Sequence, residues 1–487
     1  MSLGLCGKQK DGMSYIQFLG AAGVVTGSKH LIHVEGDGAR PLQVLVDCGL
    51  FQGQKEWRER NWQDLPVPAN TIDAVILTHA HLDHSGWIPR LVKQGFHGPI
   101  YATAPTIELC SILLPDSGHL QEEDAAFYNK TQASKHHPAL PLYTMEEAQQ
   151  CMTLFRPVNV GEVKQLSSQL SFRFVRAAHI LGSSMAEITL NSGLAAKKLL
   201  FTGDIGRVRD SEVAPGKVLY TGPTEGEDCD LLVMESTYGN RLHPHNDPRP
   251  EMAALIRTAL QRGGSVVVPS FAVERTQEFL FMLKELMESG QVPRVPVHAD
   301  SPMAIKAVQI FMQHSEEFTP ETKAMIGKYG SPLDWPGFHF DVSQDDSKKI
   351  NNIKSPVIII SSSGMVAGGR ILHHLMLRLP DPKNLVLFIG FQAPGTRGFT
   401  IQHGAPQVKM FGQEIPIRAQ VASLEQFSDH ADTPELLEWL HTFRRAPSVT
   451  YLVHGEPAAA AQLRDAMVQA LGWNVQVAVY REKVQVE

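Results

Sequence analysis

The stretch Ile72–Trp87, IDAVILTHAHLDHSGW, runs from an apolar strand directly into a cluster of metal-binding side chains. His79, His81, Asp83 and His84 follow the strand at spacing i, i+2, i+4 and i+5. In an extended loop the first two point the same way, and the turn into a helix brings the last two to a second point nearby. Imidazole and carboxylate ligands without thiolate suit Zn²⁺ or Mn²⁺ bound for catalysis. The alternative is a solvated loop in which Asp83 only caps the helix, and four such side chains in six positions disfavour it.

Other apolar runs also end in side chains that can bind or support a metal. Open α/β sheets gather their ligands at the carboxyl ends of strands. The residues at these run ends are Asp47, His179, Asp204, Glu235 and His454. Each is a weak signal alone, but together they predict one rim of ligands.

Short β-branched runs alternate with helical patterns along the chain, which predicts an α/β fold. In the first half, strands are expected at Gln43–Val46, Ala74–Leu77, Phe172–Arg176, Lys198–Phe201 and Leu231–Met234, and mainly helix between Pro105 and Phe155. A second series has expected strands at Ser265–Val268, Val295–His298, Val357–Ile360 and Leu385–Ile389, and helices at Glu274–Glu288, Ile305–Gln313 and Arg370–Leu377. Linkers are expected at Asn240–Pro250 and Gln402–Val421.

The composition limits the class of protein. With 487 residues and 43% hydrophobic residues, the chain can bury a sizeable core. Five scattered cysteines without a CxxC pair are typical of free thiols in a reducing compartment. Without a signal-peptide core or an apolar run of about 18–20 residues, a cytoplasmic protein with no membrane partner is expected. The net charge of −7 disfavours a nucleic-acid partner on average.

The segments HAHLDH, AAHILGSS and FTGDIGR together resemble the metallo-β-lactamase superfamily. ESTYGNR, PSFAVERTQEFL, DSPMA, SSSGMVAGGRILHHL, GFQAPGTRG, FSDHAD and VHGE resemble its β-CASP branch of nucleic-acid hydrolases, which includes RNase J and the endonuclease of the cleavage and polyadenylation factor. This resemblance implies an αββα sandwich with an inserted α/β β-CASP domain. It places the first part of the sandwich at residues 1–239, the insert at 240–424 and the C-terminal return at 425–487.

The resemblance also assigns roles to single residues. It implies that His79, His81 and His179 hold one zinc, that Asp83, His84 and His454 hold the other, and that Asp204 bridges them. Manganese is the alternative metal. Asp47 matches an aspartate that does not bind metal itself but orients the ligating histidines. Asp83, Glu235 and His430 are the implied catalytic residues, with His430 near the scissile phosphate and Glu235 supporting the site.

Relatives that act on RNA carry Glu and His at the first and last branch motifs, as this chain does with Glu235 and His454, so the implied partner is single-stranded RNA. Two metals can neutralise a phosphate and activate water. His430 can then donate a proton to the leaving oxygen without competing for metal. Asp429 precedes it, where relatives more often have a small residue. It either raises the pKa of His430 or faces solvent.

Backbone N–H groups in a Gly-rich strand-to-helix turn can cradle phosphate, and a nearby arginine can pair with it. The tentative phosphate contacts are therefore Ser361, Ser363, Gly364 and Arg370, although packing alone explains such a turn equally well.

Three functions stay open. The leading one is a zinc-dependent ribonuclease, acting as endonuclease, 5′→3′ exonuclease or both. The others are a metallohydrolase of small esters, thioesters or lactams, and a catalytically silent scaffold for RNA processing. The sequence is compatible with a homodimer.

Overall fold

The structure is a computed structural model that describes residues 13–35, 40–132, 136–191, 196–207, 219–226, 228–244, 246–271, 273–354, 356–390, 392 and 395–486. Cys6 lies outside the described residues. The other four cysteines are buried free thiols. Within the described ranges no helix has the length and apolar character required to cross a bilayer.

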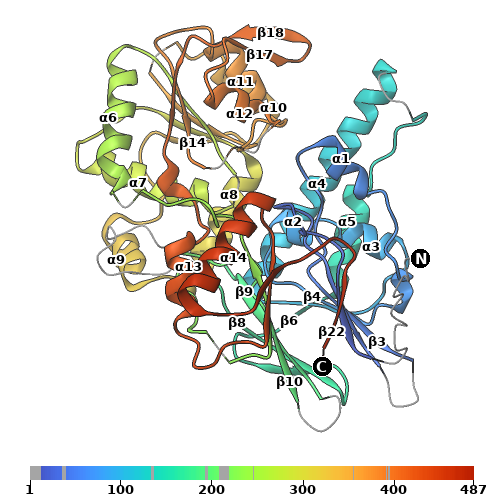
Figure 1. Ribbon diagram of the computed structural model, residues 1–487. Helices are drawn as coiled ribbons and strands as arrows, with labels where there is room; N and C mark the ends of the chain where they lie inside the picture. The colour runs from blue at the N-terminus through green and yellow to red at the C-terminus, as the bar shows by residue number, and fades with distance from the viewer. Residues whose placement is uncertain are drawn as a thin grey trace, which may run out of the picture.

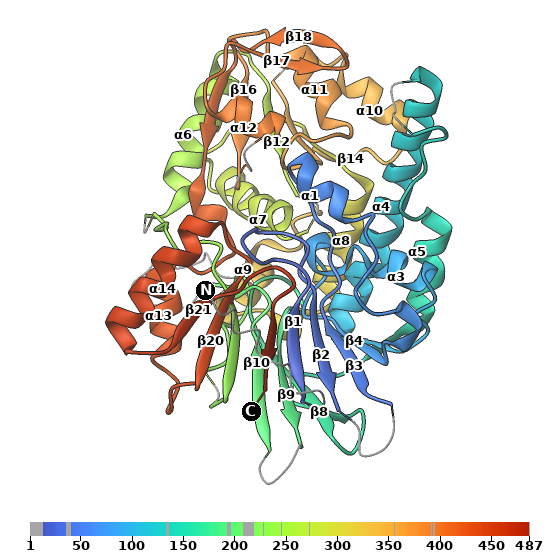
Figure 2. The ribbon, with the colours of Figure 1, turned by 45° about the vertical axis from the view of Figure 1, so that its right-hand side comes forward.

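Two seven-stranded sheets stack face to face (Figures 1 and 2). The first sheet has the order β22 (Lys483–Gln485), β1 (Tyr15–Phe18), β2 (His30–Val34), β3 (Leu42–Val46), β4 (Ala74–Ile76), β5 (Ile100–Ala102) and β6 (Phe155–Pro157). The second has the order β21 (Val475–Val477), β20 (Val449–Val453), β11 (Leu231–Glu235), β10 (Lys197–Phe201), β9 (Ser184–Leu190), β8 (Leu170–Arg176) and β7 (Val163–Gln165).

Alternating side chains along these strands fill two different layers. Val44 and Val46 of β3 point into the core between the sheets, whereas Leu45 packs against the helices outside the first sheet. These outer helices are α2 (Leu82–Ser85), α3 (Ile88–Lys93), α4 (Ala104–Thr131) and α5 (Met145–Cys151). Helix α1 (Lys55–Arg60) follows β3 and has no buried residue. Leu232 of β11 packs likewise against α13 (Thr433–Leu440) and α14 (Pro457–Leu471). The first two sheets and their helices therefore form four layers in the order αββα.

A third sheet forms a separate α/β unit between β11 and β20 in the chain. Its order is β14 (Phe338–Phe340), β13 (Val297–Asp300), β15 (Ile358–Ser361), β12 (Val266–Pro269), β16 (Leu385–Phe388) and β19 (Gln420–Ser423). Helices α6 (Pro248–Gln261), α7 (Arg275–Glu288) and α8 (Pro302–Gln313) cover one face, and α11 (Ile371–Arg378) and α12 (Arg397–Gln402) cover the other. Helices α9 (Pro320–Tyr329) and α10 (Gln344–Ile350) complete the unit. The α/β sandwich with an inserted α/β domain is thus confirmed.

Some expectations about elements need correction. All nine expected strands exist, but Val295–His298 begins two residues later as β13. The expected linker Gln402–Val421 contains a hairpin of β17 (Gln407–Met410) and β18 (Gln413–Pro416) and the start of β19. Its polar, Gly-containing sequence resembles a linker because these strands lie at an edge of the unit, where alternate positions are exposed.

The inserted unit packs directly on the sandwich. Phe311 of α8 belongs to the same apolar core as Leu109 of α4. An ion pair joins Arg176 to Glu317, and His314 lies 3.0 Å from Glu108. These contacts hold the two units in one relative position.

Candidate metal centre

The strand ends of both sandwich sheets meet at one edge. Strand β3 pairs in parallel with β4, and β11 pairs in parallel with both β10 and β20. Parallel strands end at the same edge of a sheet, so the residues that follow them become neighbours. The register places Glu235 opposite Val453, one residue before His454. Residues separated by more than 200 positions in the chain therefore share one site.

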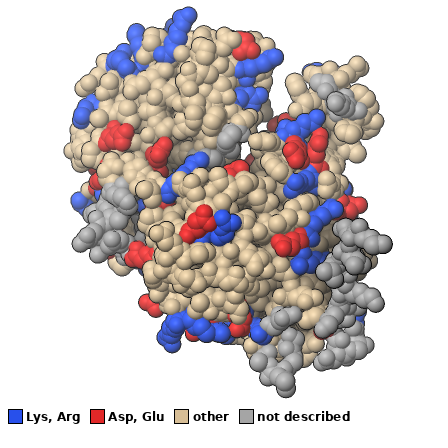
Figure 3. All heavy atoms as spheres, viewed as in Figure 1, with Lys and Arg blue, Asp and Glu red and all other residues tan. Residues whose placement is uncertain are grey.

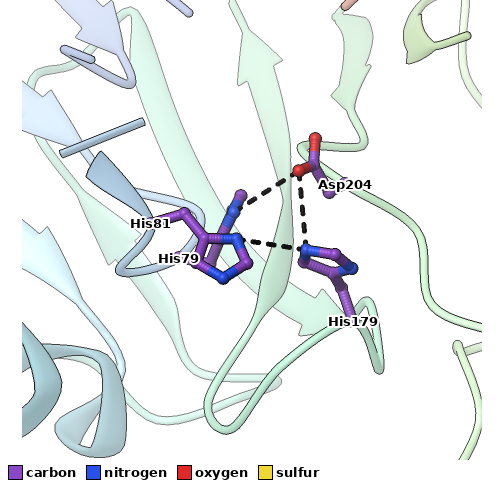
Figure 4. Close-up of side chains that lie close together, drawn as sticks. All are labelled: His79, His81, His179 and Asp204. Carbon is purple, nitrogen blue, oxygen red and sulfur yellow. Dashed lines mark hydrogen bonds and ion pairs between the residues drawn. The ribbon is translucent and has the colours of Figure 1, made fainter. Parts of the chain in front are cut away.

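The first ligand group contains His79, His81, His179 and Asp204 (Figure 4). His79 Nε2 and His179 Nε2 each lie 3.5 Å from Asp204 Oδ2. His81 Nδ1 lies 3.3 Å from His179 Nε2. The figure shows that the four side chains converge on one point, with His79 and His81 from one loop and His179 and Asp204 from two others.

The second group contains Asp83, His84 and His454. His454 Nε2 lies 3.3 Å from Asp83 Oδ2 and 3.2 Å from His84 Nε2. His81 is the N-cap of α2, so Asp83 and His84 lie in the first turn of that helix.

Asp204 lies between the two groups. Its Oδ2 faces His79 and His179, whereas its Oδ1 lies 3.3 Å from His84 Nε2 and 3.5 Å from His454 Nδ1. Burial alone raises the pKa of this carboxyl, but His454, His84 and His79 outweigh burial and hold the pKa well below its usual range. The side chain is therefore a carboxylate with one oxygen toward each group.

The donor set fits metal ions. Burial lowers the pKa of His79 and His179 well below 6.5 and that of His81 to about 4, so these rings are neutral, as ligation requires. His79 Nε2 and Asp204 Oδ1 are buried and make no hydrogen bond within the part of the chain that the structure describes. Buried polar atoms normally have partners, and a bound cation would provide one for both.

Asp47 orients one of the candidate ligands. Its Oδ2 accepts a hydrogen bond from His84 Nδ1 at 2.7 Å, which leaves Nε2 of that ring free to face the site. The backbone N–H and the hydroxyl of Thr78 also donate to this carboxylate, at 2.8 and 2.9 Å. Sequence reasoning missed Thr78, although it directly precedes His79.

His430 lies beside the two ligand groups and contacts Glu235. Its Nδ1 lies 3.1 and 3.0 Å from the two carboxylate oxygens, and its Nε2 lies 4.0 Å from Asp204 Oδ2. Burial disfavours the charged ring, yet Glu235 and Asp204 raise the pKa of His430 to about 9. Glu235 is itself fully buried and accepts the backbone N–H of Ile205 at 2.6 Å.

His243 supports the backbone at His430 and was missed in the sequence. Its Nε2 donates to the carbonyl oxygen of His430 at 2.7 Å, and its ring stacks on Tyr238 at 4.9 Å between centroids. The Asp432 carboxylate accepts its backbone N–H. Its place in the motif ESTYGNR followed by Leu and His was the available signal.

Of the two expected roles of Asp429, facing solvent is wrong, whereas its electrostatic interaction with His430, which lowers the pKa of Asp429, agrees with the other. Its carboxylate faces the Arg275 guanidinium, with 3.5 Å between Oδ2 and Nε, and its side chain is 15% exposed. Burial raises the pKa of Asp429, and Arg275 opposes that rise. The residue therefore pairs with the inserted unit and does not face solvent.

The four tentative phosphate contacts lie in the inserted unit. Ser361 is buried and donates to the carbonyl oxygen of Asp300, so its hydroxyl is unavailable, contrary to the expected phosphate contact. Arg370 donates to the Asp300 carboxylate and to two backbone carbonyls. Ser363 accepts the N–H of Ala367. Within the described ranges, none of these side chains bonds to the metal-ligand groups, and substrate contact by Ser363, Gly364 or Arg370 stays a prediction.

Comparisons with known proteins agree with this architecture. Family models match at residues 43–110 (metallo-beta-lactamase superfamily), 276–401 (Beta-Casp domain) and 414–478 (Zn-dependent metallo-hydrolase RNA specificity domain). The chain is 36% identical over 90% of its length to "Ribonuclease TTHA0252" of Thermus thermophilus, covering 92% of that protein. It is 32% identical over 85% of its length to an "RNase J-like protein" of Methanocaldococcus jannaschii, covering 87% of it.

A solved structure has the same fold. A protein of unknown function from Enterococcus faecalis superposes with a TM-score of 0.52 at 14% identity, over 97% of this chain and all of the other. The family models and the ribonuclease relative confirm the resemblance first drawn from the motifs, and the chain belongs to the β-CASP branch of the metallo-β-lactamase superfamily.

Proposed function

We propose that this protein is a zinc-dependent ribonuclease that hydrolyses phosphodiester bonds of single-stranded RNA during RNA processing or decay. The observation that carries the proposal is the position of Asp204, whose two oxygens face two separate groups of metal-binding side chains, with His430 beside them. The names of the relatives, ribonuclease and RNase J-like protein, support RNA as the substrate. An RNA specificity domain that includes His430 and His454 supports it further.

We propose that His79, His81 and His179 hold one metal, that Asp83, His84 and His454 hold the other, and that Asp204 contacts both. Zinc is the proposed metal because the donors are imidazole and carboxylate and because the matching family model is described as Zn-dependent. When bound, the metals supply positive charge for the phosphate and lower the pKa of water in the site.

The protein's own residues perform the remaining tasks. Asp47 holds the His84 ring so that Nε2 faces the site. Glu235 accepts a hydrogen bond from Nδ1 of His430, which turns Nε2 of that ring toward Asp204 and the substrate. A proton on His430 Nε2 can then pass to the leaving oxygen of the phosphodiester. Glu235 acts as the positioning residue for this step.

The same reasoning extends to organisation and location. We propose the boundaries 1–239, 240–424 and 425–487 because every strand of the third sheet lies between residues 266 and 423. Four buried free thiols agree with a reducing compartment, and we propose a cytoplasmic location.

The proposal is tested with end-labelled RNA that carries a 5′-hydroxyl, monophosphate or triphosphate end, alongside matched DNA and a chromogenic β-lactam. Metal-loaded protein is expected to cleave the RNA and to leave the other two intact. The product ladder for each 5′ end separates internal cleavage from 5′→3′ trimming. Cleavage of the lactam with intact RNA would instead identify a small-molecule hydrolase, and no turnover of any substrate would favour a scaffold.

A further inference from the structure

A second polar pocket lies apart from the metal-ligand groups. It is a small hollow, partly open to solvent, between the loops that follow β1 and β3, helix α1 and the turn before β22. Three cationic side chains line it: Lys29, Arg60 and Arg481. None of the residues that line it belongs to the candidate metal centre.

Lys29 is a buried cation whose positive charge has no carboxylate partner among the described residues. Only 3% of the residue is exposed, and its ammonium group donates to the carbonyl oxygen of Gly49. The nitrogen also lies 4.8 Å from the ring centre of Phe51 and 5.2 Å from that of Trp87. An ammonium group has three donors, and among the described residues no carboxylate accepts from this one. Burial lowers the pKa of Lys29 to about 8, so the uncompensated charge is costly.

The two arginines also lie beside aromatic rings, but Arg60 is half-buried and Arg481 is exposed. The Arg60 guanidinium lies 4.3 Å from the ring centres of both Trp57 and Tyr480, and the Arg481 guanidinium lies 5.4 Å from that of Tyr480. In the described parts of the chain neither guanidinium has a carboxylate partner or a hydrogen-bond acceptor. The lining contains one carboxylate, Asp64, which accepts from Gln94 Nε2 at 2.6 Å.

Three cationic side chains therefore line a hollow whose lining contains a single carboxylate, in a protein whose net charge is −7. We propose that this pocket binds a phosphate group. Guanidinium groups present paired donors that match phosphate oxygens, and the aromatic rings shield the ion from water, which strengthens each contact. A phosphate would also supply the acceptor that Lys29 lacks. The proposal does not depend on the proposed nuclease activity.

The test measures binding by equilibrium dialysis, with radiolabelled inorganic phosphate and adenosine 5′-monophosphate on the metal-loaded chain and a short 5′-hydroxyl RNA on the metal-depleted chain, which is not expected to cleave it. The variants are Arg60→Gln and Arg481→Gln, with Arg58→Gln as the matched control. Arg58 lies on the same helix as Arg60, is exposed and does not line the pocket.

Each pocket variant is expected to weaken binding about tenfold to a hundredfold, which corresponds to losing one charge-assisted hydrogen-bonding group. Arg58→Gln is expected to bind like the parent chain. Binding is also expected to survive chelation of the metals in protein that circular dichroism shows to be folded. If the pocket variants bind inorganic phosphate and the nucleotide more weakly, the ligand is a free phosphate compound. If they bind only the RNA more weakly, the ligand is a phosphate of the RNA chain.

Equal binding by all four proteins, or complete loss of binding on chelation, would overturn the proposal. RNA cleavage is not measured in this experiment, so failure of the pocket and failure of the nuclease assignment are distinguishable.

Discussion

His430 is the residue on which the proposed chemistry depends most directly. Its Nε2 is 4.0 Å from Asp204, and it belongs to neither ligand group. His430→Ala is therefore expected to lower kcat about 10²–10⁴-fold, the range of a lost general acid, and to leave the metal content unchanged. Single-turnover RNA cleavage and metal analysis of the same sample measure both. The exposed His441 supplies the control variant His441→Ala, and full activity in His430→Ala would remove this residue from the mechanism.

Glu274 gives a prediction about pH and stability. The residue is 3% exposed, accepts a hydrogen bond from Tyr220 Oη at 2.5 Å and lies near Asp429. Burial, together with Asp429, raises the pKa of this carboxyl well above 4.5. Because the folded-state pKa is raised, its contribution to stability is full below the ordinary pKa and falls as the pH rises toward the folded-state value.

Glu274→Gln keeps the acceptor for Tyr220 and removes the titration. The variant is expected to gain stability over the parent as the pH rises, by about 1–3 kcal/mol at pH 8, and to gain less at pH 5. Thermal unfolding at the two pH values measures the difference. Glu251→Gln, an exposed change on α6, is the control, and a difference independent of pH would contradict the argument.

The turn between β15 and α11 gives a prediction about one element. A Cβ atom on Gly364 would lie 2.6 Å from the Phe271 ring and 2.9 Å from its backbone nitrogen, whereas a Cβ on Gly368 in the same turn would meet nothing within 4 Å. Gly364→Ala is expected to cost about 1–3 kcal/mol of unfolding free energy through overpacking, and Gly368→Ala to cost less than half of that. Denaturant unfolding measures both changes.

If this turn also contacts substrate, Gly364→Ala raises KM for RNA in addition to lowering stability. An unchanged KM in a destabilised variant would assign Gly364 to packing alone, which is how the structure already accounts for Ser361.

The metal centre links elements across the whole molecule. Its ligands follow β4 of one sandwich sheet and β8, β10 and β20 of the other, so bound metal connects the two sheets. Chelation is expected to lower the stability of the folded chain by about 3 kcal/mol or more, since a ligand at 100 times its Kd stabilises by about 2.7 kcal/mol. Calorimetry before and after chelation measures the loss, and added Zn²⁺ is expected to reverse it. The variant Asp204→Asn weakens both ligand groups, so its stability is expected to change less on chelation.

Charge on the whole surface predicts how RNA binding responds to salt. The net charge is −7, and on the face shown in Figure 3 Lys and Arg are interspersed with Asp and Glu and form no continuous stripe. Few phosphate contacts are therefore expected, with a log–log slope of binding against salt about −0.7 per contact for a single strand. A slope that corresponds to about 6–10 contacts would reveal an extended basic groove.

The sequence by itself determined those features of the protein that depend only on consecutive residues. An apolar strand followed by HAHLDH carries both its structure and its ligands in consecutive residues, and so do the runs that end in His179, Asp204 and His454. The rule that parallel strands end at a common edge was then sufficient to predict one site. For the same reason the nine expected strands were located to within two residues, whereas β9, β14 and β19 were not predicted.

Only the tertiary structure decided which distant side chains are partners. Asp429 pairs with Arg275, Arg370 with Asp300, and three cations from separate segments share a pocket, and no local pattern records these choices. The physical reason is that the energy of an ion pair depends on the distance between the two charges in the folded chain and on how deeply they are buried. Neither quantity follows from the separation of the two residues in the sequence. The pairing of β11 with β20 brings Glu235 and His454 to the same edge across more than 200 residues, and that juxtaposition exists only in the folded chain.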